Sequence, residues 1–201
     1  MGLHRAGFDV VGVDIRPQPR YPFTFLQGDA LAADVRGFAF IWASPPCQAF
    51  SQMTPAAAKE RHQDLIEPTR SKLRQAGCAY IIENVERSPL LDPVKLDGAM
   101  FGLGVIRIRW FESNVFLMTP RPVRRAAGVE DWCSVFGSGN GPSRRSNGKT
   151  IYVKPGINNV RAWRDAMGIQ WMTGRELTQA IPPAYSECLA RQVVQGLRAA
   201  A

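Results

Sequence analysis

The chain of 201 residues lacks any apolar run that approaches the roughly 18 residues of a membrane-spanning helix. Its amino-terminal stretch has no apolar core of the kind that marks a secretory signal peptide. It has only two histidines, and its four cysteines lie far apart without a Cys-x-x-Cys pair. The sequence therefore predicts a cytoplasmic protein with free thiols, no metal site and no membrane contact.

What is present is the composition of a globular protein, with 45% hydrophobic and 21% charged residues. The length suits one domain with a small appendage. A net charge of +8 favours a polyanionic partner. This charge is uneven, because residues 121–160 contain seven basic and two acidic residues and are rich in glycine, proline and serine. Either a solvated loop or a nucleic-acid contact would explain such a segment.

Local patterns predict alternating strands and helices. Residues 2–7 resemble the end of a helix that stops at Gly7, and we expect further helices at 64–76, 160–169, 174–180 and 184–198. Apolar runs predict strands at 9–14, 23–27, 38–42 and 78–85. This alternation is typical of an α/β protein with a mostly parallel sheet covered by helices on both faces.

Cys47 follows the strand expected at 38–42 and is preceded by Pro45 and Pro46. Prolines fix the backbone, and the carboxyl ends of strands in open α/β sheets are where ligands bind. A buried structural cysteine in a tight turn is the alternative for this residue taken alone.

Three further features are expected near strand ends. Asp14 and Asp29 each follow a strand and suit the ribose hydroxyls and the adenine amino group of a nucleotide, although surface carboxylates are common there. Glu83 closes an apolar strand, where desolvation raises a carboxyl pKa and suits a proton donor. Arg107 and Arg109 share one side of an extended segment and suit a phosphate or a carbonyl oxygen.

Together these residues resemble the DNA cytosine-5 methyltransferase family, in the style of its short prokaryotic and phage members. The motifs that carry the resemblance are Pro45-Pro46-Cys47-Gln48 with Phe50-Ser51, Glu83-Asn84-Val85 and Arg107-Ile108-Arg109. Asp14 and Asp29 match the two acids on the cofactor side, and Ile181–Tyr185 takes the place of the last motif. The resemblance covers nearly the whole chain.

The resemblance implies a Rossmann-like class I methyltransferase sheet, with residues 1–115 as catalytic lobe, a small basic target-recognition region at 116–160 and helices at 161–201 that return to the lobe. It implies S-adenosylmethionine as methyl donor and a flipped cytosine in double-stranded DNA as substrate. A companion chain or a restriction enzyme is a further partner that the resemblance leaves open.

The implied roles follow the motifs. Cys47 would attack C6 of cytosine, Glu83 would protonate or hydrogen-bond N3, Arg109 would hold O2, and Arg107 would support the Cys47 loop or a phosphate. Cofactor contacts are expected from Asp14, Ile15, Asp29, Ala30 and Pro46. DNA contacts are expected from Gln48, Ser51, Asn84, Arg144 and Arg145.

The chain departs from the family pattern in three places. It starts within what should be the first helix, without the strand and the glycine-rich turn that hold the methionine part of the cofactor. A start site placed too late, a true remnant, or a strand supplied by a partner chain would each explain this, and two neighbouring strands should then keep unpaired edges. Val105 replaces a glutamine, and Pro183-Ala184-Tyr185 replaces a Gly-Asn pair.

Three other functions remain open. A relative that acts on RNA or transfers a modified group would share the catalytic residues. A non-catalytic DNA-binding remnant would not bind S-adenosylmethionine. A cysteine hydrolase would need a histidine base, but His62 lies in a polar stretch and His4 is the only other histidine.

Overall fold

The structure is a computed structural model that describes residues 1–52, 54–123, 135 and 160–199. Within these ranges the chain forms helices and short strands in the order α1 (Gly2–Arg5), β1 (Val11–Asp14), β2 (Thr24–Gln27), β3 (Phe40–Ala43), α2 (Ala56–Lys59), α3 (Ile66–Ala76), β4 (Ala79–Asn84), β5 (Val94–Leu96), the 3-10 helix η1 (Gly98–Phe101), β6 (Arg109–Ser113), α4 (Val160–Met167), α5 (Gly174–Gln179) and α6 (Pro183–Ala199). The protein is therefore of the mixed α/β type, as the sequence predicts.

The described strands form two sheets. β1 and β2 pair in parallel, and the second sheet has the order β3-β4-β6-β5. β3 and β4 are parallel, but β6 runs antiparallel to both β4 and β5. The expectation of a mostly parallel sheet holds only in part, because β1–β2 and β3–β4 are parallel pairs whereas β6 runs antiparallel to both of its neighbours. β5 is only three residues long, which is too short for a pattern to predict.

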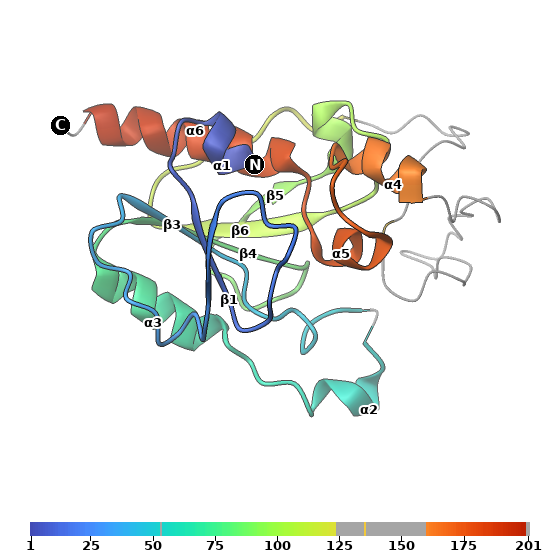
Figure 1. Cartoon of the computed structure of the whole chain (residues 1–201), viewed down its shortest axis with the longest axis horizontal. Helices are drawn as coiled ribbons and strands as arrows, with labels where there is room; N and C mark the ends of the chain where they lie inside the picture. The colour runs from blue at the N-terminus through green and yellow to red at the C-terminus, as the bar shows by residue number, and fades with distance from the viewer. Residues whose placement is uncertain (53, 124–134, 136–159, 200–201) are drawn as a thin grey trace.

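Strand β4 forms the centre of the core, and all six of its residues are buried. Because strand side chains alternate, Ile81 packs with Tyr185, Leu189 and Val193 of α6 on one face. Tyr80 and Ile82 pack with Ile66 and Leu73 of α3 on the other. Figure 1 shows α6 and α3 on opposite sides of the strands. The prediction of helices on both faces is confirmed.

Helix α1 lies against α6, although the two are far apart in the sequence (Figure 1). Gly2 permits this approach, because a Cβ added there would lie 2.0 Å from Oγ of Ser186. The helix ends as the sequence predicts, since Gly7 follows it with a φ of +101°, in a region that favours glycine. The amino-terminal segment is thus firmly anchored to the last helix.

Four strands are edge strands within the part of the chain that the structure describes, namely β1, β2, β3 and β5. There, β1 pairs only with β2, and β3 pairs only with β4. Val11 and Val13 of β1 are 37% and 36% exposed. The sheet of β1 and β2 is tied to α3 by Lys72, whose Nζ donates to the carbonyl oxygens of Leu31 and Ala33.

Candidate active site

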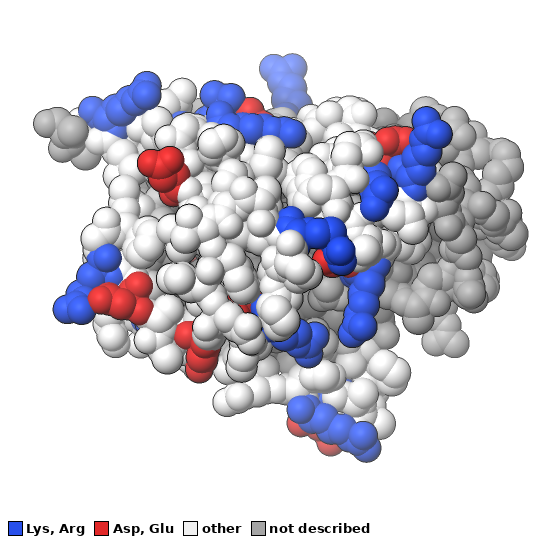
Figure 2. Space-filling model, viewed as in Figure 1, with Lys and Arg blue, Asp and Glu red and all other residues white. Residues whose placement is uncertain are grey.

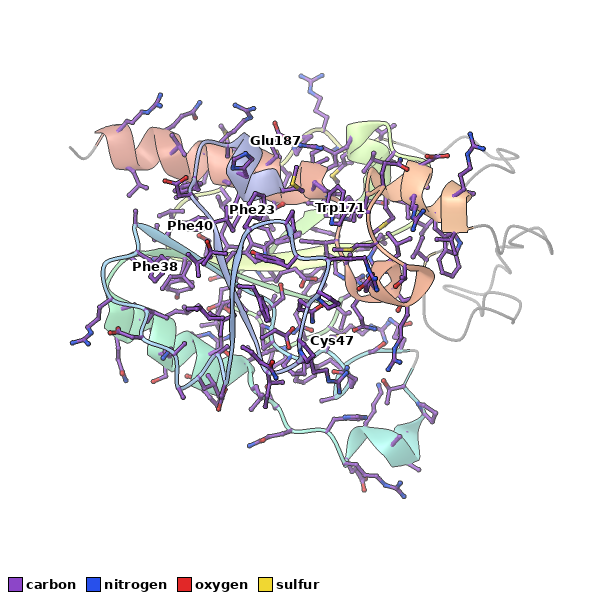
Figure 3. All side chains as sticks on the ribbon, viewed as in Figure 1. Phe23, Phe38, Phe40, Cys47, Trp171 and Glu187 are labelled. Carbon is purple, nitrogen blue, oxygen red and sulfur yellow. The ribbon has the colours of Figure 1, made fainter. Side chains whose placement is uncertain are left out.

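A rigid loop presents Cys47 beyond the end of β3. The backbone N–H groups of Phe50 and Ser51 donate to the carbonyl of Cys47 at 3.0 and 2.8 Å and close a turn behind it. The side-chain amide of Asn84, at the end of β4, donates to the carbonyl of Pro45 at 3.0 Å. Figure 3 places Cys47 centrally, below α5, while Phe38 and Phe40 lie at the opposite end of β3. The thiol is therefore at the carboxyl edge of the sheet.

Glu83 lies at the same edge, because β3 and β4 are parallel and Ala43 is in register with Ile82. Its Oε1 accepts an ion-pair hydrogen bond from Nε of Arg109 at 3.0 Å, across the antiparallel pair of β4 and β6. The Ser44 hydroxyl also bonds to this carboxyl group. Adjacent strands thus bring a cysteine, a carboxyl group and an arginine together.

Burial is the largest influence on the pKa of the Glu83 carboxyl group. Desolvation raises the pKa of its carboxyl group, although the charge of Arg109 and the bond from Ser44 act in the opposite direction. A carboxyl group with a raised pKa keeps its proton to a higher pH than an exposed one and can donate it. The expectation of a partly desolvated acid at this strand end is confirmed, since Glu83 is only 8% exposed.

Cys47 is half-buried and titrates under the same influences. Desolvation raises the pKa of its thiol, the charge of Arg109 lowers it, Glu83 raises it and Arg107 lowers it. These mutual effects show that the four expected catalytic residues lie close enough to influence one another's charge. A thiol in this setting needs a base or a positive charge to become a nucleophile.

Arg107 differs from Arg109 in its contacts. Its side chain is only 5% exposed, and its terminal nitrogens donate to the carbonyls of Val135 (2.5 Å) and Thr178 (2.8 Å). Burial, with a contribution from the charge of Arg109, lowers its pKa. The side chain therefore binds the protein's own backbone, where the sequence suggested the Cys47 loop or a phosphate.

Asp14 and Asp29 both lie at the end of the smaller sheet. The N–H of Gly28 donates to the carbonyl of Asp14 at 3.0 Å, so Asp29 follows directly after the last bond between the two strands. Oδ1 of Asp14 accepts from the N–H of Arg16, and Oδ1 of Asp29 accepts from the N–H of Leu31, both at 2.8 Å. These bonds hold each carboxylate in one orientation at a strand end.

The other residues expected to contact the cofactor are open to solvent. Ile15 is 69% exposed, and Ala30 and Pro46 are also exposed.

Helix α5 adjoins both groups of residues. Arg20, in the loop that follows Asp14, donates from Nε to both carboxylate oxygens of Glu176, at 3.1 and 2.9 Å. Arg107 donates to Thr178 of the same helix. Glu176 also completes a capping box with Thr173, which fixes the start of α5. The acids of the small sheet and the cysteine site therefore flank one helix.

The residues expected to contact DNA fall in three settings. Gln48 is partly buried, and its Oε1 has no hydrogen-bond partner among the described residues. Asn84 is buried and holds Pro45, so it shapes the cysteine loop, and a contact of this residue with DNA stays a prediction. Ser51 lies in the same loop and is partly exposed. Arg144 and Arg145 lie outside the described residues, as does most of the 116–160 region.

On the face that Figure 2 shows, Lys and Arg side chains lie both at the rim and near the middle, with Asp and Glu side chains interspersed among them. The described residues on this face therefore form no continuous basic band.

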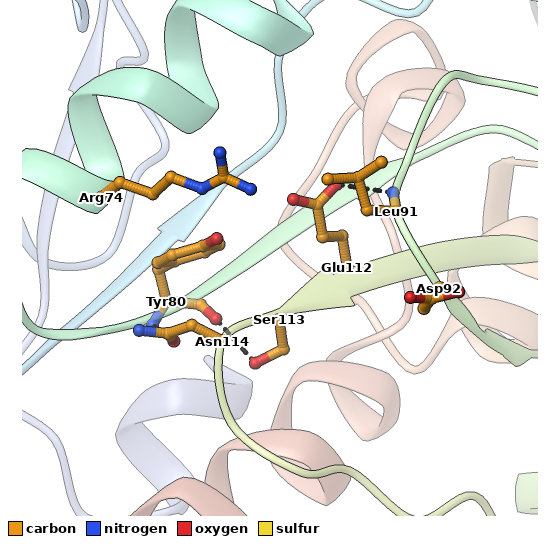
Figure 4. Close-up of a pocket in the computed structure, with 7 residues that line it drawn as sticks. All are labelled: Arg74, Tyr80, Leu91, Asp92, Glu112, Ser113 and Asn114. Carbon is orange, nitrogen blue, oxygen red and sulfur yellow. Dashed lines mark hydrogen bonds between the residues drawn. The ribbon is translucent and has the colours of Figure 1, made fainter.

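A separate pocket of about 410 Å³ lies near the beginning of β4 and the end of β6 (Figure 4). Polar groups that line this pocket already have hydrogen-bond partners within the protein. Glu112 accepts from the N–H of Leu91, and Ser113 donates to the carbonyl of Tyr80. None of the expected catalytic residues lines it. The lining residues are Arg74, Tyr80, Leu91, Asp92, Glu112, Ser113 and Asn114.

Sequence reasoning missed several residues that shape the site. Ser44 bonds to Glu83 and also accepts from Nε1 of Trp42 at 3.2 Å. Tyr185 donates from its hydroxyl to the carbonyl of Arg107 at 2.8 Å. A serine directly after a strand is only a weak indication of a functional residue. No local sequence pattern could predict the bond between Tyr185 and Arg107, which are 78 positions apart.

A scan against protein-family models and a search of curated proteins found no match to this chain. The described helices include none that is long and apolar enough to cross a membrane. No group of three or more potential metal ligands occurs among the residues that were described and searched.

Proposed function

We propose that the chain is a DNA cytosine-5 methyltransferase that uses S-adenosylmethionine, with Cys47 as its nucleophile. The observation that carries the proposal is the meeting of Cys47 with the paired, buried side chains of Glu83 and Arg109 at one sheet edge. These are the residues of the three motifs that resemble the family. A sheet with helices on both faces and acids at the ends of β1 and β2 supports the Rossmann-like class.

The residues present suit the cofactor. Asp14 and Asp29 both lie at the carboxyl end of the smaller sheet, and each carboxylate is oriented by a backbone N–H. Asp14 would hold the ribose hydroxyls, and Asp29 would accept from the adenine amino group. S-adenosylmethionine, when bound, supplies the methyl group that is transferred to C5 of cytosine.

The chain's own residues would activate the base. The thiolate of Cys47 attacks C6, the electron pair of the C5–C6 double bond moves between C5 and C4, and the C4–N3 pair moves onto N3, which takes a proton from Glu83. C5 is then the nucleophilic carbon of an enamine. The raised pKa of Glu83 favours the protonated form that this step needs. Arg109 holds O2 against the charge that develops. At the end a base such as water takes the proton from C5, the C5–C6 double bond forms again and the Cys47 Sγ–C6 bond breaks to release the thiolate, while N3 returns its proton to Glu83.

Covalent trapping tests this proposal. Duplex DNA with 5-fluorocytosine at many sequence positions is incubated with the protein and S-adenosylmethionine, and denaturant-stable adducts are resolved by gel electrophoresis. Fluorine at C5 blocks the final elimination, so an active enzyme stays attached through Cys47. Cys47→Ser should abolish the adduct, while Cys78→Ser, at another free and partly buried cysteine, should retain it. An adduct that survives Cys47→Ser would exclude the mechanism.

A non-catalytic DNA-binding remnant is the second candidate, and the open edges of β1 and β3 within the described part favour it. Such a remnant would bind duplex DNA without binding S-adenosylmethionine. Isothermal titration with S-adenosylmethionine separates the two candidates, since heat of binding at a stoichiometry near one supports the enzyme. DNA binding without that heat, and without an adduct, supports the remnant.

A further inference from the structure

We propose that Arg107 is a positioning residue that joins Val135, within the basic region, and helix α5 to the strand that carries Arg109. Its catalytic consequence rests on the proposed function, whereas its structural part stands on contacts in the fold. Through this residue, Val135, helix α5 and the start of the strand of the Glu83–Arg109 pair share one anchor.

The guanidinium group of Arg107 bonds to two distant parts of the chain. One terminal nitrogen donates to the carbonyl of Val135 and the other to that of Thr178 in α5. Val135 is only 2% exposed and belongs to an apolar cluster that also contains Leu177. In the sequence, residues 136–159 with Arg144 and Arg145 lie between these two anchors.

The main chain of Arg107 is fixed as firmly as its side chain. Its carbonyl accepts a hydrogen bond from the hydroxyl of Tyr185 in α6 at 2.8 Å. Tyr185 is fully buried and packs against the rings of Phe101 and Phe111. Arg109 follows two residues later and bonds to Glu83. A shift of Arg107 would therefore move the arginine that is proposed to hold cytosine O2.

Arginine suits this place because its planar fork reaches two carbonyls at once, which a lysine ammonium does not match in geometry. The two terminal nitrogens are already bonded, and Nε is buried without a hydrogen-bond partner among the described residues. This side chain therefore does not present a free guanidinium group that could bind a phosphate. The contacts favour a structural role, in which Arg107 links Val135 and Thr178 within the protein.

The test compares Arg107→Lys with Arg175→Lys, a matched change at an exposed arginine of α5. Trapping on 5-fluorocytosine DNA is measured at saturating DNA, and duplex affinity is measured by fluorescence anisotropy with circular dichroism as a check on folding. Arg107→Lys should slow trapping about tenfold or more while the Kd for DNA changes less than about threefold, because misplacement affects the chemical step. Arg175→Lys should change neither. Equal trapping by Arg107→Lys and the wild type would overturn the proposal.

Tyr185→Phe supplies a second variant, since it removes the hydroxyl that donates to the Arg107 carbonyl. If both residues act through one anchor, the double variant should lose less in trapping than the product of the two single losses. Losses that multiply would show separate actions and would contradict the proposal.

Hydrogen exchange separates a failure of this inference from a failure of the proposed function. Arg107→Lys should speed amide exchange in residues 174–180 and 109–113 even if the wild type forms no adduct with DNA. Unchanged exchange at both segments would refute the link through Arg107 whether or not the protein is an enzyme. Faster exchange in a chain without methyltransferase chemistry would support the link and remove only its catalytic consequence.

Discussion

The guanidinium of Arg109 and the carboxyl group of Glu83 form a largely buried pair, with 3.0 Å between Nε and Oε1 and side-chain exposures of 17% and 10%. Burial still raises the pKa of Glu83, so the pair favours a proton at this position more than an exposed ion pair would. Cys47 lies within electrostatic reach of both residues. This combination of an acid, a cation and a thiol underlies the predictions below.

Glu83→Gln should change how the free energy of unfolding depends on pH. The unfolded carboxyl ionises at about pH 4.3, and the folded one at higher pH. Between these values the folded state binds more protons, so the wild type should lose stability as pH rises, and the variant should lack this loss. Each pH unit between the two pKa values corresponds to about 1.4 kcal/mol. Urea denaturation from pH 4 to 8 measures the difference, and parallel curves would contradict the raised pKa.

The thiol of Cys47 should react slowly at neutral pH in the free protein. Burial raises its pKa above the ordinary value of about 8.5, so little thiolate is present at pH 7. Iodoacetamide labelling followed by peptide mass spectrometry should show a rate that still increases above pH 9. Arg109→Met should move this increase to higher pH, because it removes the neighbouring positive charge that lowers the pKa. A half-maximal rate at or below pH 8.5 in the wild type would be inconsistent with the site.

Asn84→Ala should loosen the cysteine loop without removing any residue of the proposed chemistry. The lost bond to the Pro45 carbonyl should lower stability by about 1 kcal/mol. Trapping should slow about tenfold, because the loop no longer holds Cys47 in place. Hydrogen exchange of residues 47–51 provides the structural readout. If these amides exchange as in the wild type, the bond does not position the loop.

Arg144→Ala combined with Arg145→Ala should weaken duplex binding and reduce its dependence on salt. Each lost phosphate contact should reduce the slope of log K against log salt concentration by about 0.9. Arg198→Ala, at an exposed arginine in the last turn of α6, serves as the matched control. Anisotropy titrations at several salt concentrations give the slopes. An unchanged slope in the double variant would move the DNA-binding surface away from the basic region.

Local sequence patterns determined much of this protein. Apolar runs placed β1, β2, β3 and β4 to within a few residues, Gly7 marked the end of α1, and a glutamate after an apolar strand proved to be desolvated. These features depend on near neighbours in the chain, so periodicity and residue type suffice to predict them. The short segments α2, β5 and η1 had no such pattern and were missed.

The tertiary structure alone decided how these parts work together. It reversed β6 against β4, which lets Arg109 meet Glu83, and it bound the Asn84 amide to Pro45, 39 positions away. It also directed the side chain of Arg107, expected to support the Cys47 loop or a phosphate, to the carbonyls of Val135 and Thr178. Such contacts join residues far apart in sequence and depend on the packing of the whole sheet. The sequence therefore named the chemical groups, whereas the fold set the partners that fix their positions and charge.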